Sequence, residues 1–125
     1  DDLWGDLPPT ETLRTPFVIL KEQAKLLQDK TNGLLAVELK QNQGGTQFIY
    51  DFFIVAPTLN NYSYHLLTVS HDLGFYPTRV INRGTNQQST CATEEEFLQA
   101  LRNAFSAEQN RSVIHKLLTH IGSQD

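Results

Sequence analysis

The feature that most constrains the fold is a change in the spacing of apolar residues near position 34. Before it, Phe17, Leu20, Ala24 and Leu27 recur at the spacing of one face of a helix. After it, apolar and polar residues alternate along 34–40, which is the period of a β-strand with two different faces. A helix followed at once by strands predicts a mixed architecture, in which an amphipathic helix covers a sheet.

Start and stop signals locate the predicted helices. Thr15 followed by Pro16 has the pattern of an N-cap and a first helical residue, and Asn32-Gly33 supplies a stop. Capping-box spacings beginning at Thr93 and at Ser106 predict two further helices near the C-terminus.

The strands are predicted from a hairpin signal and from β-forming residues. Gly44-Gly45 suits the two central positions of a tight turn, so that Gln43 faces Thr46 and Glu38 faces Asp51. The second strand spans 48–56 and is apolar on both faces, which suggests cover on its second face too. Further strands are predicted at 62–71 and 76–82, and a brief additional strand at 89–92 is left open.

Together these elements predict an α+β two-layer sandwich. An antiparallel four-stranded meander packs against an N-terminal helix and two C-terminal helices, and residues 1–125 form a single domain. Residues 1–9 form an irregular N-terminal arm, in which Trp4 is expected to cover an edge of the core.

Composition narrows the classes of partner. The formal net charge is -4, and the 10 Lys and Arg residues form no basic stripe, so we expect no nucleic acid. No apolar run approaches the length of about 20 residues that spans a bilayer, so we expect no membrane partner. Cys91 is the single cysteine and has no internal disulfide partner, which favours a cytoplasmic protein. No motif predicts a cofactor.

One group of polar residues is a candidate for catalysis. The predicted register places Glu38 directly across from Asp51, where two like charges repel unless a proton or a cation compensates them. If Phe53 pairs with His65, the imidazole lies diagonally beside Asp51, and two carboxylates with a histidine suit a divalent metal. Lys40 on the same face would support an attacking water. The plainer interpretation is a solvated strand face, without a bound metal.

Glu38-Leu39-Lys40 together with Asp51 resembles the PD-(D/E)xK nuclease motif over these few residues. The resemblance implies metal-dependent hydrolysis of a phosphodiester. In that family the acidic residue precedes the E-x-K strand, whereas Asp51 follows it. The upstream acid, Asp29, has no proline before it and lies at the predicted end of a helix.

A surplus of aromatic residues points to an interface or a pocket. Tyrosine combines a ring with a polar tip, which suits a surface that receives a partner. Two arginines on the fourth strand are placed to clamp an anion or a partner carboxylate. The candidate binding residues are Tyr50, Phe53, Tyr62, Tyr64, Arg79 and Arg83.

The sequence therefore favours a non-enzymatic protein–protein interaction module. We expect it to form a homo-oligomer, most simply a homodimer, or to bind another protein through a face or an edge of its sheet, in an adaptor, inhibitor or immunity-like role. One alternative is a metal-dependent hydrolase or nuclease-like enzyme that uses Glu38, Lys40, Asp51 and His65. Another is a small-ligand-binding domain with an aromatic pocket.

Overall fold

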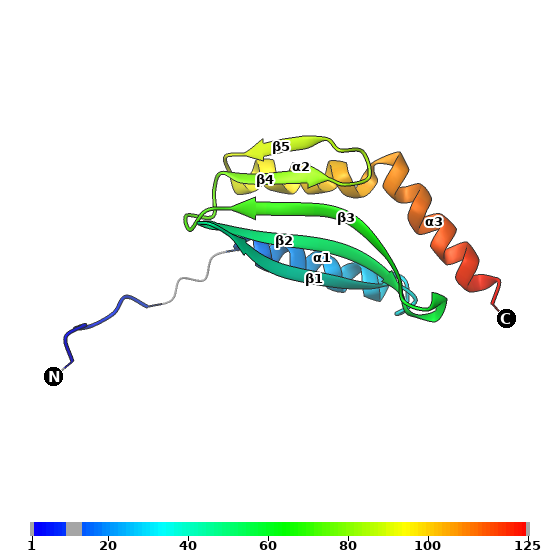
Figure 1. The fold of residues 1–125 in the computed structure, drawn as a ribbon, viewed down its shortest axis with the longest axis horizontal. Helices are drawn as coiled ribbons and strands as arrows, with labels where there is room; N and C mark the ends of the chain where they lie inside the picture. Colours follow the sequence, from blue (N-terminus) through cyan, green and yellow to red (C-terminus); the bar gives the residue numbers. More distant parts are fainter. Residues whose placement is uncertain (1, 10–13, 125) are drawn as a thin grey trace.

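The computed structural model of the protein describes residues 2–9 and 14–124. Within these ranges the chain forms a helix, five antiparallel strands in one sheet and two further helices, so the predicted α+β architecture is confirmed with one additional strand (Figure 1). The elements are α1 (Pro16–Lys30), β1 (Ala36–Gly44), β2 (Gln47–Ala56), the short 3-10 helix η1 (Pro57–Leu59), β3 (Tyr62–His71), β4 (Thr78–Asn82), β5 (Gln88–Cys91), α2 (Glu94–Ser106) and α3 (Glu108–Gly122).

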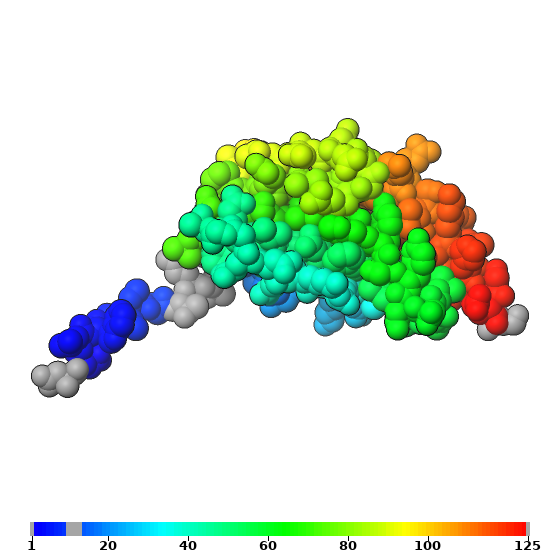
Figure 2. Space-filling view, viewed as in Figure 1, coloured from blue at the N-terminus to red at the C-terminus, as the bar shows by residue number. Residues whose placement is uncertain are grey.

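The sheet is a meander in which each strand pairs with its neighbour in sequence, in the order β1-β2-β3-β4-β5. Helix α1 lies behind β1 and β2, and α2 lies behind β4 and β5 (Figure 1). The sheet thus has a covered face, turned toward the helices, and an open face, turned toward the viewer in Figures 1 and 2. No helix in the described part of the chain combines the length and apolar character that a membrane crossing requires.

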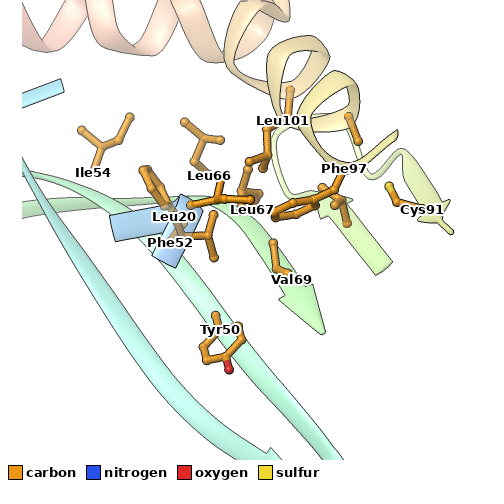
Figure 3. Close-up of a cluster of buried hydrophobic side chains, with 14 of the residues drawn as sticks. Leu20, Tyr50, Phe52, Ile54, Leu66, Leu67, Val69, Cys91, Phe97 and Leu101 are labelled. Atoms are coloured by element: carbon orange, nitrogen blue, oxygen red, sulfur yellow. The ribbon is translucent and has the colours of Figure 1, made fainter. Parts of the chain in front are cut away.

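The hydrophobic core lies between the covered face and the helices (Figure 3). Phe52 from β2 packs against Phe105 from α2, with their ring centroids 5.5 Å apart. Phe97 of α2 is fully buried, as are Ile19 and Leu20 of α1. Both helices therefore bury one stripe each against a shared sheet, which stabilises the two-layer arrangement.

Two of the predicted helix starts are confirmed. The hydroxyl of Thr15 accepts a hydrogen bond from the amide of Val18 at 3.3 Å, and Thr93 accepts one from the amide of Glu96 at 3.2 Å. The stop after α1 is also confirmed, because Asn32 and Gly33 adopt positive φ angles of 52° and 79°.

The predicted start of α3 at Ser106 is wrong. Ser106 is the last residue of α2, and its hydroxyl donates to the carbonyl of Arg102 at 2.7 Å. The chain breaks at Ala107, whose ψ of 134° is extended, and α3 begins without a side-chain cap. A serine at the end of one helix satisfies its hydroxyl on the preceding turn, so the capping-box spacing alone did not locate this boundary.

The predicted register of the first hairpin is also wrong, by two residues. Gly44 pairs with Gln47, so the turn is Gly45-Thr46, and Asp51 faces Lys40 rather than Glu38. Glu38 faces Phe53 instead. Because the shift is even, every side chain keeps the face that the sequence predicted.

The N-terminal arm does not cover the core as predicted. Trp4 is 80% exposed, and Leu3 and Leu7 are 92% and 69% exposed. Residues 2–9 extend away from the body of the molecule (Figures 1 and 2).

Candidate functional site on the open face

A network of polar side chains crosses the middle of the open face. The hydroxyl of Thr68 donates to Oδ1 of Asp51 at 2.7 Å, and Nε2 of His65 lies 3.0 Å from the same oxygen. Nε of Arg83 donates to the hydroxyl of Thr68 at 3.0 Å. Asn42 on β1 reaches Oδ2 of Asp51 at a longer 3.4 Å. We call Asp51, His65, Thr68 and Arg83 the polar network.

A β-bulge in β3 makes this network possible. Phe52 pairs with Leu67 and Phe53 pairs with His65, so Leu66 has no partner on β2. Leu66 and Leu67 are both buried, at 1% and 0% exposure, and both point toward the helices (Figure 3). Residues three apart on a regular strand lie on opposite faces, but the extra residue returns His65 to the same face as Thr68.

The arrangement of protons in the network is not that of a catalytic triad. Thr68 has one proton, which it donates to Asp51 while accepting from Arg83. Both Asp51 and Thr68 approach the same ring nitrogen of His65, Nε2, at 3.0 and 3.1 Å. A nucleophile and an orienting acid must engage different nitrogens of the base, so no proton relay is assembled here. The network instead joins β2 and β3 to Arg83, which directly follows β4, through hydrogen bonds.

The predicted cluster of Glu38, Lys40, Asp51 and His65 is only partly brought together. Asp51 and His65 are in contact, as the predicted pairing of Phe53 with His65 requires. The carboxylate of Glu38 lies instead 3.4 Å from Nζ of Lys40, on the exposed edge strand. Among the residues the structure describes, no three His, Cys, Asp or Glu side chains converge as metal ligands.

Phe53 forms an apolar wall beside the network. Its ring stacks on His65 with centroids 4.4 Å apart, and Nζ of Lys40 lies 4.9 Å from its centroid. Cation–π contact of this kind holds the lysine over the ring. The side chain of Asp51 is 19% exposed.

The six candidate binding residues divide between the two faces. Phe53, Arg79 and Arg83 belong to the open face, and Arg79 pairs with Ser70. Tyr50 is 8% exposed on the covered face, where its ring stacks on Phe17 of α1 at 5.0 Å. The six residues therefore do not share one surface, and their role in binding stays a prediction.

Tyr64 and Tyr62 lie where β3 meets the C-terminal helix. The hydroxyl of Tyr64 donates to Asn110 of α3 at 2.6 Å. Tyr62 lines a hollow of about 420 Å³ together with Leu59 and His120. Both tyrosines alternate with open-face residues, so neither contacts the polar network.

Burial shifts the pKa of three tyrosines and of the cysteine. It raises the pKa of Tyr50, Tyr64 and Tyr76. Burial also raises the pKa of the Cys91 thiol, and nearby Glu96 adds to the effect. A raised thiol pKa keeps Cys91 protonated near neutral pH, which argues against a nucleophilic role.

Sequence reasoning missed Thr68, whose hydroxyl connects Asp51 to Arg83 in the polar network. Counting along a regular strand places it on the same face as Leu66 and opposite His65. The sequence carries no clear signal of the bulge, because adjacent large apolar residues occur both at Leu66-Leu67 and at Ile54-Val55, where the pairing is regular.

Around the network, the open face has apolar side chains in its middle and charged side chains of opposite sign on its two sides. The apolar side chains are half-buried although none of the described helices covers them: Ile49, Phe53, Val55 and Ile81. Glu38, Lys40 and Asp51 lie on β1 and β2, whereas Arg79 lies on β4 and Arg83 directly follows it. One side of this face is thus net acidic and the other is basic.

No family model matches this chain, and comparisons with curated proteins and with solved structures also gave no match.

Proposed function

We propose that the protein is a non-enzymatic protein–protein interaction module that forms a homodimer through the open face of its sheet. The observation that carries the proposal is the second face of β2, where Ile49, Phe53 and Val55 are apolar and no helix of the described chain covers them. A strand that is apolar on both faces is typical of a sheet covered on both sides.

The polar network suits burial in such an interface. Asp51, Thr68 and Arg83 already satisfy one another through hydrogen bonds of 2.7 and 3.0 Å. Burying an unpaired polar group costs about 1–3 kcal/mol, whereas a group that keeps its partner avoids most of that penalty. The network therefore reduces the number of polar atoms that lose a hydrogen bond when the centre of the open face is buried.

The division of charge favours a second copy of the chain as the partner. When two sheets stack about a two-fold axis parallel to their strands, β1 and β2 of each copy lie over β4 and β5 of the other. Glu38 pairs with Phe53, which pairs with His65, so Glu38 lies level with His65 along the strands. Arg83 lies at nearly the same level, because its amide donates to the carbonyl of Leu66. The two-fold then brings each glutamate to the partner's arginine, which is a self-complementary arrangement.

We place this role in the cytoplasm, where the single thiol of Cys91 stays reduced. Such a role requires neither a cofactor nor a metal.

Light scattering with matched variants tests the proposal. We expect the parent protein to dimerise with rising concentration and Phe53→Ser to remain monomeric, because Phe53 lies at the centre of the open face. Leu73→Ser removes an apolar side chain that is 78% exposed in a loop, and it should leave the dimer intact. Circular dichroism verifies that both variants are folded. A parent that stays monomeric, or a Phe53→Ser variant that dimerises like the parent, contradicts the proposal.

A further inference from the structure

A groove runs between the helices on the side of the molecule opposite the open face. Two hollows of about 380 and 220 Å³ both include Gln23 of α1 and Phe105 of α2 in their linings, so they adjoin at these two side chains, and we call the pair the groove. Its floor is apolar and comes from the sheet, through Phe52, Ile54 and Leu66. Its walls add leucines from α1 and α2, namely Leu26, Leu27, Leu98 and Leu101.

The rim of this groove is basic. Lys30 ends α1, Arg102 lies on α2 and Arg111 lies on α3, and all three side chains line the groove. Within residues 2–9 and 14–124, none of these three cations forms an ion pair, and no carboxylate lines either hollow. An apolar floor with a cationic rim fits an acidic segment that carries large apolar side chains.

The N-terminal arm of the same chain has that composition. Residues 2–7 read Asp-Leu-Trp-Gly-Asp-Leu, so two acids alternate with three apolar side chains. Those apolar side chains, Leu3, Trp4 and Leu7, are 92%, 80% and 69% exposed. Tryptophan anchors are among the residues that contribute most to protein interfaces when they enter an apolar pocket.

The root of the arm is held between the first turns of α1 and α2. Arg14 bonds Glu22 of α1 at 2.6 Å and Glu94 of α2 at 3.3 Å, so it spans the gap between the two helices. Both helices begin at the end of the molecule where the arm leaves (Figure 1). The seven residue-to-residue steps from Leu7 to Arg14 can span at most about 24 Å. Gln23 lies only about 10 Å along α1 from its first residue, Pro16, so the arm reaches the groove.

We infer that residues 3–7 of the arm dock in the groove between α1 and α2 of their own chain, with Trp4 against its apolar walls, where Leu26 is 47% exposed, and Asp6 at the basic rim. Figure 1 shows the arm in its undocked arrangement. Docking within one chain is favoured over docking between copies because the short connection holds the arm at a high effective concentration, on the order of millimolar. The surface used is separate from the open face, so this inference does not depend on the proposed dimer.

The fluorescence of Trp4, the single tryptophan, reports docking directly. We expect a blue-shifted emission that resists an added neutral quencher and does not change with protein concentration. Arg102→Glu reverses a charge at the rim and should restore the emission of an exposed tryptophan. Arg79→Glu makes the same charge change on the open face and should leave the emission blue-shifted. Circular dichroism of both variants verifies folding.

Three outcomes overturn the inference. One is a fully exposed emission in the parent protein at every concentration. Another is a blue shift that Arg102→Glu leaves intact, because the rim then has no part in it. The third is a blue shift that appears only as concentration rises, which identifies the groove of a second copy as the binding site.

Discussion

The hydroxyl of Tyr64 on β3 donates a 2.6 Å hydrogen bond to Oδ1 of Asn110 on α3, a residue with no exposed surface. The amide nitrogen of Asn110 in turn donates to Oδ1 of Asn82 at 3.0 Å and to the carbonyl of Ala104 at 2.9 Å. A Cβ atom on Gly84 would overlap both Asn110 and Tyr64, so this position admits only glycine without a shift of its neighbours. The buried asparagine thus joins α2, α3 and the sheet at one point.

We predict that Tyr64→Phe lowers the free energy of unfolding by about 1–3 kcal/mol, because Oδ1 of Asn110 loses its hydrogen-bond donor while it stays buried. Tyr62→Phe makes the same chemical change at a side chain that is 53% exposed, and it should cost less than about 0.5 kcal/mol. Urea denaturation of both variants measures the difference. Equal midpoints for the two variants would contradict the role assigned to Asn110.

The polar network on the open face gives a second prediction. Thr68→Val keeps the shape of the side chain but removes the hydroxyl that joins Asp51 to Arg83, and Thr68 is 5% exposed. We expect a loss of about 1–3 kcal/mol in the free energy of unfolding. Thr90→Val on exposed β5 serves as the matched control and should be close to neutral. A neutral Thr68→Val would mean that the network contributes little to stability.

Alkaline pH should destabilise the fold. Burial raises the pKa of Tyr50, Tyr64 and Tyr76 above 10.0 and the pKa of Cys91 above 9.0. Below about pH 7.5 these groups keep their protons in both states, so they add no pH dependence. Above it the unfolded chain releases protons that the folded chain retains, and stability falls as pH rises.

Melting temperatures recorded between about pH 8 and 11 measure this effect. Tyr50→Phe removes one of the groups and should make the decline shallower than in the parent. A melting temperature that rises over this range would show that the sign is wrong.

The charge pairing proposed for the dimer predicts a mixing effect. Glu38→Lys alone and Arg83→Glu alone each place like charges opposite one another in both copies of the contact. We expect either variant to dimerise about tenfold more weakly at low salt. An equimolar mixture of the two variants should dimerise more tightly than either variant alone, although one copy still lacks the hydrogen bond from Arg83 to Thr68. In the mixed dimer one contact joins the two substituted side chains, which have opposite charges, and the other contact keeps the natural glutamate and arginine.

Light scattering of the mixture measures the recovery. Lys25→Glu, on the exposed side of α1, is the control for net charge and should neither weaken the dimer nor complement Glu38→Lys. A mixture as weak as its two components would exclude a two-fold axis parallel to the strands.

Local signals in the sequence predicted most of the fold. The caps at Thr15 and Thr93 and the stop at Gly33 depend on a few adjacent residues, so they could be read without knowledge of the tertiary structure. The start of α3 could not, because Ser106 has a competing partner in the carbonyl of Arg102. Both positions offer the serine a hydrogen bond, and only packing decides between them.

The candidate site was harder to predict because it depends on strand register. Gly44 and Gly45 are both permissive, and the sequence alone does not say which of them begins the turn. That choice moved Glu38 away from Asp51 by two positions. The bulge at Leu66, which has no partner on β2, places Thr68 on the same face as His65. Thr68 can join the polar network only because of this one extra residue in β3.

The meander has a consequence for how the chain is synthesised. Every strand seen in the described residues precedes Ala92, and each strand pairs only with its neighbour in sequence, so a growing chain emerges with its sheet partners already in order. Contacts between near neighbours close short loops and form quickly. Helix α1 emerges before β1 and shields that half of the covered face, whereas the half under α2 stays bare until translation passes Ser106. Until the last residues of α2 leave the ribosome, the apolar side chains of that half of the sheet can therefore bind chaperones or aggregate.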